Sequence, residues 1–171
     1  MRRILLAAAA AAVLAPAASR SQSAWDIAKK GAGASATGAL EKEVNRRLLE
    51  EGRRNQCSFQ SGTAKLEPGC GPKAARLAKA LIDAKKRLNG AGIQNFKFVV
   101  SGHTDSTGDA ARNKALSGER AAVMVKELVA KGVPAAEIES VGMGSEQPLE
   151  KPDDTPAKRA RNRRYEVQVR L

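Results

Sequence analysis

The stretch FKFVVSGHTDSTG, residues 96–108, sets the frame for the whole sequence. Residues 96–100 are nearly all apolar and end in two β-branched residues, which is typical of a strand covered on both faces. The polar run that follows holds the chain's only histidine, His103, together with Asp105 and two glycines. A polar run between a strand and a helix is a common place for a ligand-binding loop. The stretch therefore predicts a strand whose end carries the functional site.

Two amphipathic helices flank this stretch. The first is predicted over 72–90, with Pro72 at its start and Asn89–Gly90 at its end. Its apolar residues recur at spacings of three and four, which indicates one buried face: Leu77, Leu81, Ala84 and Leu88. The second helix is predicted over about 112–131, where KGVP ends it. Its core stripe includes Ala121, Val125, Leu128 and Val129.

Further strands complete the pattern. A short strand is expected over 57–59, followed by a loop over 61–69, and another strand over 138–141. A loop rich in proline and charge runs from 142 to 158. In the closing RRYEVQVRL, Tyr165, Val167 and Val169 alternate with polar residues, as in a strand with one wet face. The order predicts an α/β fold, a βαβαββ sandwich with helices packed on one face of a mixed sheet.

Residues 1–18 are expected to be a secretory signal peptide. Arg2 and Arg3 form a basic start and residues 4–15 are apolar, while APAAS offers small residues for cleavage after Ala17 or Ala18, with later sites up to Ala24. The apolar run is shorter than the roughly 20 residues that span a bilayer. No other stretch is predicted to cross a membrane, and no cysteine stands at the cut to carry a lipid.

Residues 19–55 are predicted to hold a linker and an amphipathic helix, ahead of a compact domain at 56–171. The segment KKGAGASATG, residues 29–38, has the small residues of a flexible linker. Next, Leu40, Val44 and Leu48 fall on one face of a helix that ends near Gly52. This face can pack on the domain or on a partner, and we expect it to pack on the domain.

Cys57 and Cys70 are expected to form a disulfide. Export would place them in an oxidising compartment, where disulfides persist. Closing so short a loop would stabilise the domain by about 3 kcal/mol. The alternative is two buried thiols. A metal site needs more ligands than two cysteines and one distant histidine supply, so we expect neither a metal nor a cofactor.

The chain carries a net charge of +12. Three of its thirty basic residues and none of its eighteen acidic residues lie in 1–24, so the remainder keeps +9. Such a charge attracts polyanions of any kind, including acidic lipid head groups and cell-wall polymers. Export argues against a nucleic-acid partner, and the five aromatic residues are too few and too scattered for a base-stacking platform. They are Trp25, Phe59, Phe96, Phe98 and Tyr165.

Ser101, His103 and Asp105 resemble a catalytic group, but the sequence favours binding. Ser101 and His103 share one face of the strand end, yet neither a GxSxG turn nor a second base supports a nucleophile. No second histidine supports a zinc hydrolase. We therefore expect no enzymatic activity. His103 is expected to be structural, with its ring forming hydrogen bonds to loop backbone.

Asp105 and Arg120 are the predicted binding pair. Asp105 ends the strand, Gly108 lets the backbone turn, and Asn113 can both donate and accept hydrogen bonds. Arg120 lies one step from the core stripe of the following helix, so its guanidinium can reach toward the loop. A carboxylate and a guanidinium across a cleft suit a zwitterion, whose ammonium takes the acid and whose carboxylate takes the arginine. The alternative is a plain salt bridge between Asp105 and Arg120.

From Cys57 to the C-terminus the sequence resembles the OmpA-like C-terminal domain, which peptidoglycan-associated lipoproteins and flagellar stator proteins share. The matching segments are FQSGTAKLEP, VVSGHTDSTG, RNKALSGERAAVMVKELVAKGVP, SVGMGSEQP and RNRRYEV. They cover about two-thirds of the chain in family order and at family spacing. GHTD, N…LSxxRA and NRRxE form a highly specific signature when they occur together.

The resemblance implies noncovalent binding to peptidoglycan through the diaminopimelate of its stem peptide. Asp105 matches the family aspartate that takes the diaminopimelate ammonium, and Arg120 matches the arginine that takes its carboxylate. Arg163, within the NRR at 162–164, is expected in the pocket wall or its bracing. Three further positions match the supporting residues of the pocket: Thr107, Asn113 and Leu116.

The sequence departs from the family in three respects. Tyr165 replaces the usual small aliphatic residue after NRR. The Cys57–Cys70 pair is not a general family feature and is expected to staple the first loop. We also expect neither a barrel nor a lipid-bearing cysteine ahead of the domain.

We expect a periplasmic, wall-associated protein, peripheral to the outer membrane, that anchors an envelope component to the wall. The alternative is an exported structural adaptor whose helix at 40–51 docks a membrane complex, with wall contact secondary. In that case residues 25–55 would hold an envelope protein partner.

Overall fold

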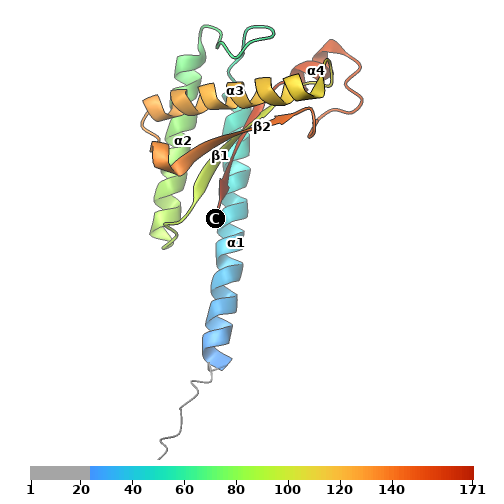
Figure 1. Ribbon diagram of the computed structural model, residues 1–171. Helices are drawn as coiled ribbons and strands as arrows, with labels where there is room; N and C mark the ends of the chain where they lie inside the picture. The colour runs from blue at the N-terminus through green and yellow to red at the C-terminus, as the bar shows by residue number, and fades with distance from the viewer. Residues whose placement is uncertain (1–23) are drawn as a thin grey trace, which may run out of the picture. The chain divides into compact units, whose positions relative to one another are not determined.

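The computed structural model describes residues 24–171, so the expected signal peptide at 1–18 lies outside the described residues. The chain divides into two units, and the second unit, Ser35–Leu171, contains the sheet and the site. The described elements, shown in Figure 1, are α1 (Ala24–Arg54), α2 (Cys70–Gly90), β1 (Lys97–His103), α3 (Ala110–Ala130), the 3-10 helix η1 (Ala135–Glu137), β2 (Ile138–Gly144), α4 (Pro156–Asn162) and β3 (Tyr165–Arg170).

The described strands form one mixed sheet in the order β2–β1–β3. β1 pairs in parallel with β2, from Phe98 opposite Ile138 to Gly102 opposite Gly142. It pairs antiparallel with β3 on its other side. Residues 98–100 are all buried, as expected of a central strand. The mixed sheet confirms the predicted α/β class.

Helices cover one face of this sheet. The predicted stripe of α2 is buried in the core together with Phe98, Val100 and Val167. Along β3 the buried residues alternate with more exposed ones, which confirms a strand with one wet face. In α3 the most deeply buried apolar residues are Ala121, Met124 and Leu128, while Val125 and Val129 are only partly buried. The core stripe of α3 is therefore rotated slightly from the prediction.

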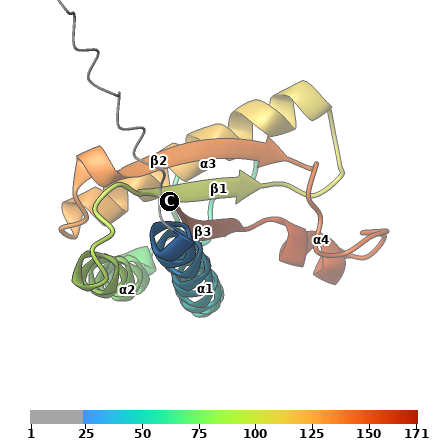
Figure 2. The same ribbon diagram turned by 90° about the horizontal axis from the view of Figure 1, so that it is seen from below.

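α3 packs directly on the backbone of β1 and β2. A Cβ atom at Gly102 would lie 2.1 Å from the carbonyl oxygen of Ser117, and one at Gly142 would lie 2.5 Å from Gly118 N. Only glycine permits this approach of helix to sheet. In Figures 1 and 2 the end of β1, the start of α3, and α4 gather at the same end of the sheet.

α1 is longer than predicted, and two of its residues within the second unit belong to the core. Residues 29–38, predicted as a linker, are helical. This part of the prediction is wrong because alanine, frequent in the segment, is the best helix former, and a formed helix extends at little cost. Val44 and Leu48 are buried in the core of the domain, which confirms the expectation that this face packs there.

Two side-chain amides, Asn45 in α1 and Gln56 just after it, cover the open edge of β3. Asn45 Nδ2 donates to Val169 O at 3.0 Å, and Asn45 Oδ1 accepts from Val169 N at 2.6 Å. Gln56 pairs with both backbone groups of Tyr165, at 2.7 Å and 3.3 Å. At these two positions the amides replace a neighbouring strand and satisfy the exposed backbone groups.

Tyr165 ties β3 to the end of α1. Its hydroxyl donates to Asn55 O at 2.5 Å and accepts from Cys57 N at 3.2 Å, and both contacts are buried. The residue that departs from the family pattern is thus a buried link between two elements.

Two predicted segments take a different form. Residues 57–59 do not form a strand, since only an isolated bridge joins Phe59 to Leu66. The loop predicted over 142–158 is shorter, because β2 continues to Gly144 and α4 begins at Pro156 with Thr155 as its cap. The predicted disulfide between Cys57 and Cys70 is confirmed.

Candidate functional site

The site is built on the turn between β1 and α3. The register of β1 against β2 shifts after Gly102, just before β1 ends. Gly108 has a φ of 90°, a left-handed conformation that favours glycine, and it turns the chain toward α3. The Asp109 carboxylate then caps the helix by accepting from Arg112 N at 2.8 Å. These features fix residues 104–107 at the end of the central strand.

Asp105 is held as a carboxylate in this turn. It is only 7% exposed. Its Oδ1 accepts hydrogen bonds from the backbone N and the hydroxyl of Thr107, and its Oδ2 accepts from Arg163 at 2.7 Å. Burial raises the pKa of Asp105, but the hydrogen bonds from Thr107 and Arg163 outweigh burial and leave this pKa below its usual value. Asp105 is therefore ionised at neutral pH.

Arg120 reaches the same region from α3. It is 9% exposed, its Nε donates to Thr63 O at 2.8 Å, and its guanidinium lies 5.2 Å from the centre of the Phe59 ring. Burial lowers the pKa of Arg120, and the nearby positive charge of Arg163 lowers it further, while Asp105 raises it. An arginine nevertheless stays charged in a protein.

Asp105 and Arg120 do not form an ion pair with each other. Within residues 24–171 the ion-pair partner of Asp105 is Arg163, and Arg120 has no acidic partner there. The alternative prediction of an Asp105–Arg120 salt bridge is therefore wrong. The physical reason is that Thr63 O and the Phe59 ring hold the guanidinium, while Arg163 occupies one side of the carboxylate.

The other predicted residues surround this pair. Thr107 bonds to Asp105, and Asn113 Nδ2 donates to Thr107 O at 2.9 Å, which fixes the turn from the first part of α3. Leu116 lines the cleft beside them. The Arg163 side chain is 46% exposed, so it lies on the solvent side of the carboxylate. Thr107 and Arg163 thus orient Asp105, and Asn113 acts through Thr107.

Sequence reasoning missed a second acid that braces the turn. Asp153 accepts from Ser106 N at 2.9 Å, from Ser106 Oγ at 2.5 Å and from Asn162 at 3.1 Å. The hydrogen bonds from Ser106 and Asn162 lower the pKa of Asp153 to about 2. Asn162 is fully buried and also bonds to backbone groups of Leu149 and Glu150. The NRR segment at 162–164 pointed to Asn162 in the sequence, whereas no motif distinguishes Asp153 from its charged neighbours in the loop.

His103 is buried but does not brace the loop through its ring. Its side chain is 2% exposed, and neither ring nitrogen has a hydrogen-bond partner among the described residues. The predicted ring-to-backbone hydrogen bonds are therefore wrong, since the contact with the neighbouring strand end runs through backbone, from His103 N to Arg164 O at 2.8 Å. Burial lowers the pKa of His103 to about 4, so the ring is neutral at pH 7.

One cleft of about 1170 Å³ collects all the predicted ligand-binding residues. They are Asp105, Thr107, Asn113, Leu116, Arg120 and Arg163. Five further arginines also line the cleft: Arg53, Arg112, Arg159, Arg161 and Arg164. Seven arginines and four acidic residues thus line the cleft, so its wall is positive on balance, and His103 is not among its lining residues.

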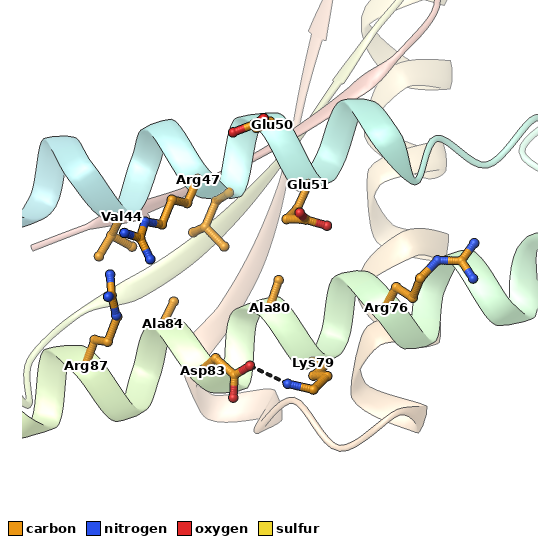
Figure 3. Close-up of a pocket in the computed structure, with 11 residues that line it drawn as sticks. Val44, Arg47, Glu50, Glu51, Arg76, Lys79, Ala80, Asp83, Ala84 and Arg87 are labelled. Carbon is orange, nitrogen blue, oxygen red and sulfur yellow. Dashed lines mark hydrogen bonds and ion pairs between the residues drawn. The ribbon is translucent and has the colours of Figure 1, made fainter.

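A smaller pocket of about 400 Å³ lies between α1 and α2, as shown in Figure 3. Ala80 and Ala84 face between the helices, and Arg47 and Arg87 point toward one another from opposite sides. Acidic residues also line this pocket, so its charge is mixed. None of the predicted site residues lines it.

The described residues offer little for a metal ion or a membrane span. Within 24–171, no three histidine, cysteine, aspartate or glutamate side chains gather where they could hold a metal ion. Over the same residues, none of the helices combines the length and the apolar character needed to cross a membrane.

The mixed sheet with helices on one face, and the cleft at the end of its central strand, define a small α/β binding domain. The model of the OmpA family matches residues 58–163, and the chain belongs to this family. The matched segment includes every predicted ligand-binding residue.

Three comparisons illustrate the likeness. The "Peptidoglycan-binding protein ArfA" of Mycobacterium tuberculosis is 41% identical over 73 residues, which is 43% of this chain and 22% of that protein. The peptidoglycan-associated lipoprotein from Burkholderia pseudomallei has a TM-score of 0.55 at 22% identity, over 67% of this chain and 89% of that one. The cell wall anchor of the T6SS from Pseudomonas aeruginosa has a TM-score of 0.51 at 27% identity, over 65% and 72% of the two chains. The match thus spans about a fifth of the curated relative.

Proposed function

We propose that this protein binds peptidoglycan noncovalently, through the zwitterionic end of the diaminopimelate in its stem peptide. The observation that carries the proposal is the pair of opposite charges in one cleft. Asp105 is ionised there, and Arg120 is fixed there without an acidic partner among residues 24–171. A relative named as a peptidoglycan-binding protein and a solved cell wall anchor support the class of ligand.

The two charges suit the two groups of the ligand. A carboxylate offers about four lone-pair positions, and the contacts with Thr107 and Arg163 occupy three of those of Asp105. The ammonium of the ligand would take the remaining position of Asp105. The terminal NH2 groups of Arg120 form no hydrogen bond with a described residue, so they would hold the ligand carboxylate in a bidentate contact.

We propose binding without catalysis. His103, the only histidine in the chain, is buried and neutral and lies outside the cleft lining. A general base must reach the proton that it removes, and His103 has no such access. The positive wall of the cleft would hold the anionic wall polymer rather than react with it.

We further propose a periplasmic location in which the domain anchors an envelope component to the wall. The alternative, an adaptor that docks a membrane complex through α1, has less support. The apolar stripe of α1 is already in use, since Val44 and Leu48 are buried in its own domain. Such a partner would have the pocket between α1 and α2 as a docking place.

Co-sedimentation with purified sacculi tests the proposal. Wild type should pellet in moderate salt, and Asp105→Ala and Arg120→Ala should stay in the supernatant, because losing one member of a charge-assisted pair in a cleft costs about 2–5 kcal/mol. Glu119→Ala and Arg170→Ala are controls, since they change the net charge equally at exposed positions. If the cleft variants pellet like these controls, binding is general charge adhesion and the cleft proposal fails.

A further inference from the structure

We infer that the loop between Cys57 and Cys70 is a positioning segment for Arg120, and that Phe59 is its positioning residue. The inference rests on the proposed function, because it assigns Arg120 the task of holding a ligand carboxylate. The inference adds which contacts keep the Arg120 guanidinium in place. The Phe59 ring lies under one face of the guanidinium, and Arg120 Nε donates a hydrogen bond to the Thr63 carbonyl oxygen.

The two contacts leave the binding groups of Arg120 available. Arg120 Nε donates to the Thr63 carbonyl oxygen at 2.8 Å, and the centre of the Phe59 ring lies 5.2 Å from the guanidinium carbon. A bidentate grip on a carboxylate uses two parallel N–H donors of the fork. Holding Nε and one face therefore orients the fork and leaves its terminal NH2 groups to the ligand. Without these contacts the Arg120 side chain would sample several rotamers, and fixing it in one of them on binding would cost conformational entropy.

The loop has the rigidity that this task requires. Gln60 N donates to Lys65 O at 2.9 Å and Glu67 N donates to Ser58 O at 2.9 Å, on either side of the Phe59–Leu66 bridge. Thr63 N donates to Gln60 O at 3.1 Å, which closes the tip. The loop is thus a small hairpin, and the carbonyl that holds Arg120 stands at its tip.

The disulfide holds the base of this hairpin. Cys57 leads into it, and Cys70 is the first residue of α2, so the bond ties the hairpin to a helix of the core. Cys57 N is also held by the Tyr165 hydroxyl at 3.2 Å. Residues 60–63 are exposed, whereas Phe59 and Leu66 are partly buried against the core. The contacts at the base, this packing and the contact with Arg120 at the tip together hold the loop.

Affinity for sacculi in a double-mutant cycle tests the inference. Phe59→Leu keeps an apolar side chain but removes the aromatic face, and should weaken binding about three- to tenfold. Phe59→Tyr keeps the face and should bind like wild type. In an Arg120→Ala background, measured at low salt where that variant still binds weakly, Phe59→Leu should cause no further loss. A merely structural role would give the same loss in both backgrounds, and that result would overturn the inference, as would full binding by Phe59→Leu.

The Nε–H signal of Arg120 in an NMR spectrum provides a second test that needs no ligand. In wild type this proton should exchange slowly, because Thr63 O accepts it, and Phe59→Leu should speed the exchange. If the Nε proton of Arg120 in wild type exchanges as fast as that of an exposed arginine, the loop does not position Arg120, and this conclusion holds whatever the wall-binding assay shows. If instead Arg120→Ala leaves wall binding unchanged while the Nε–H protection depends on Phe59, the proposed function fails and the positioning stands.

Discussion

Replacing Tyr165 with phenylalanine should destabilise the domain by removing one hydroxyl group. Tyr165 is 2% exposed, and its hydroxyl donates to Asn55 O and accepts from Cys57 N in buried surroundings. A net hydrogen bond contributes about 1 kcal/mol, and a buried polar group left without a partner costs about 1–3 kcal/mol. Since two backbone groups lose their partner, we expect the free energy of unfolding to fall by about 2–3 kcal/mol.

The same substitution should remove a pH dependence. Burial raises the pKa of Tyr165 to about 12, although the hydrogen bond from Cys57 opposes it. An unfolded tyrosine ionises near pH 10. Between pH 10 and 12 the unfolded state therefore loses a proton that the folded state keeps, so stability falls as pH rises, by about 1.4 kcal/mol per pH unit. Tyr165→Phe has no such group and should lack this part of the slope.

Urea denaturation at pH 8 and pH 11, followed by circular dichroism, measures both effects. The difference between wild type and Tyr165→Phe should shrink as pH rises, because the contribution of the hydroxyl fades. Tyr165 is the only tyrosine, so phenolate absorbance reports its titration directly in the folded protein. A loss below about 0.5 kcal/mol at pH 8, or a phenolate that forms near pH 10 in the folded protein, would refute the reasoning.

Three further predictions concern stability. Burial lowers the pKa of His103 to about 4, so below about pH 6.5 the unfolded state binds a proton that the folded state does not, and stability falls toward pH 4. His103→Phe should flatten this fall in melts at acid pH, and an unchanged dependence of stability on pH would contradict a neutral, buried His103. Gly102→Ala should lower the free energy of unfolding by about 1–3 kcal/mol or more in urea melts, because the added Cβ atom would lie 2.1 Å from Ser117 O. If this variant is as stable as wild type, α3 does not pack so closely on the sheet. Reducing Cys57–Cys70 with a dithiol should lower the free energy of unfolding by about 3 kcal/mol. An unchanged free energy of unfolding in urea melts would mean that the disulfide does not stabilise the domain.

Much of the fold was predictable from local patterns. The stripe of α2 repeats at helical spacing and residues 98–100 of β1 form an unbroken apolar run, and both are buried as predicted. The disulfide followed from export and spacing, and the structure contains it. Asp105 and Arg120 could be paired because both lie on elements adjoining one turn, and they do line the same cleft.

The remaining features depend on contacts between distant segments. Arg163 lies 58 residues from Asp105, so no periodicity predicted their ion pair. The same holds for Asp153 and Ser106, which are 47 residues apart. The linker was predicted wrongly because composition alone cannot show that a helix will extend through residues 29–38.

Affinity for two soluble stem peptides tests the central claim most directly. One peptide ends in meso-diaminopimelate and the other carries lysine in its place, so they share the ammonium and differ by one carboxylate. We predict that the diaminopimelate peptide binds at least about tenfold more tightly, that Arg120→Ala binds both peptides equally weakly, and that Asp105→Ala binds neither. If wild type binds both peptides equally, or Arg120→Ala still prefers diaminopimelate, the cleft does not hold the ligand through these two charges.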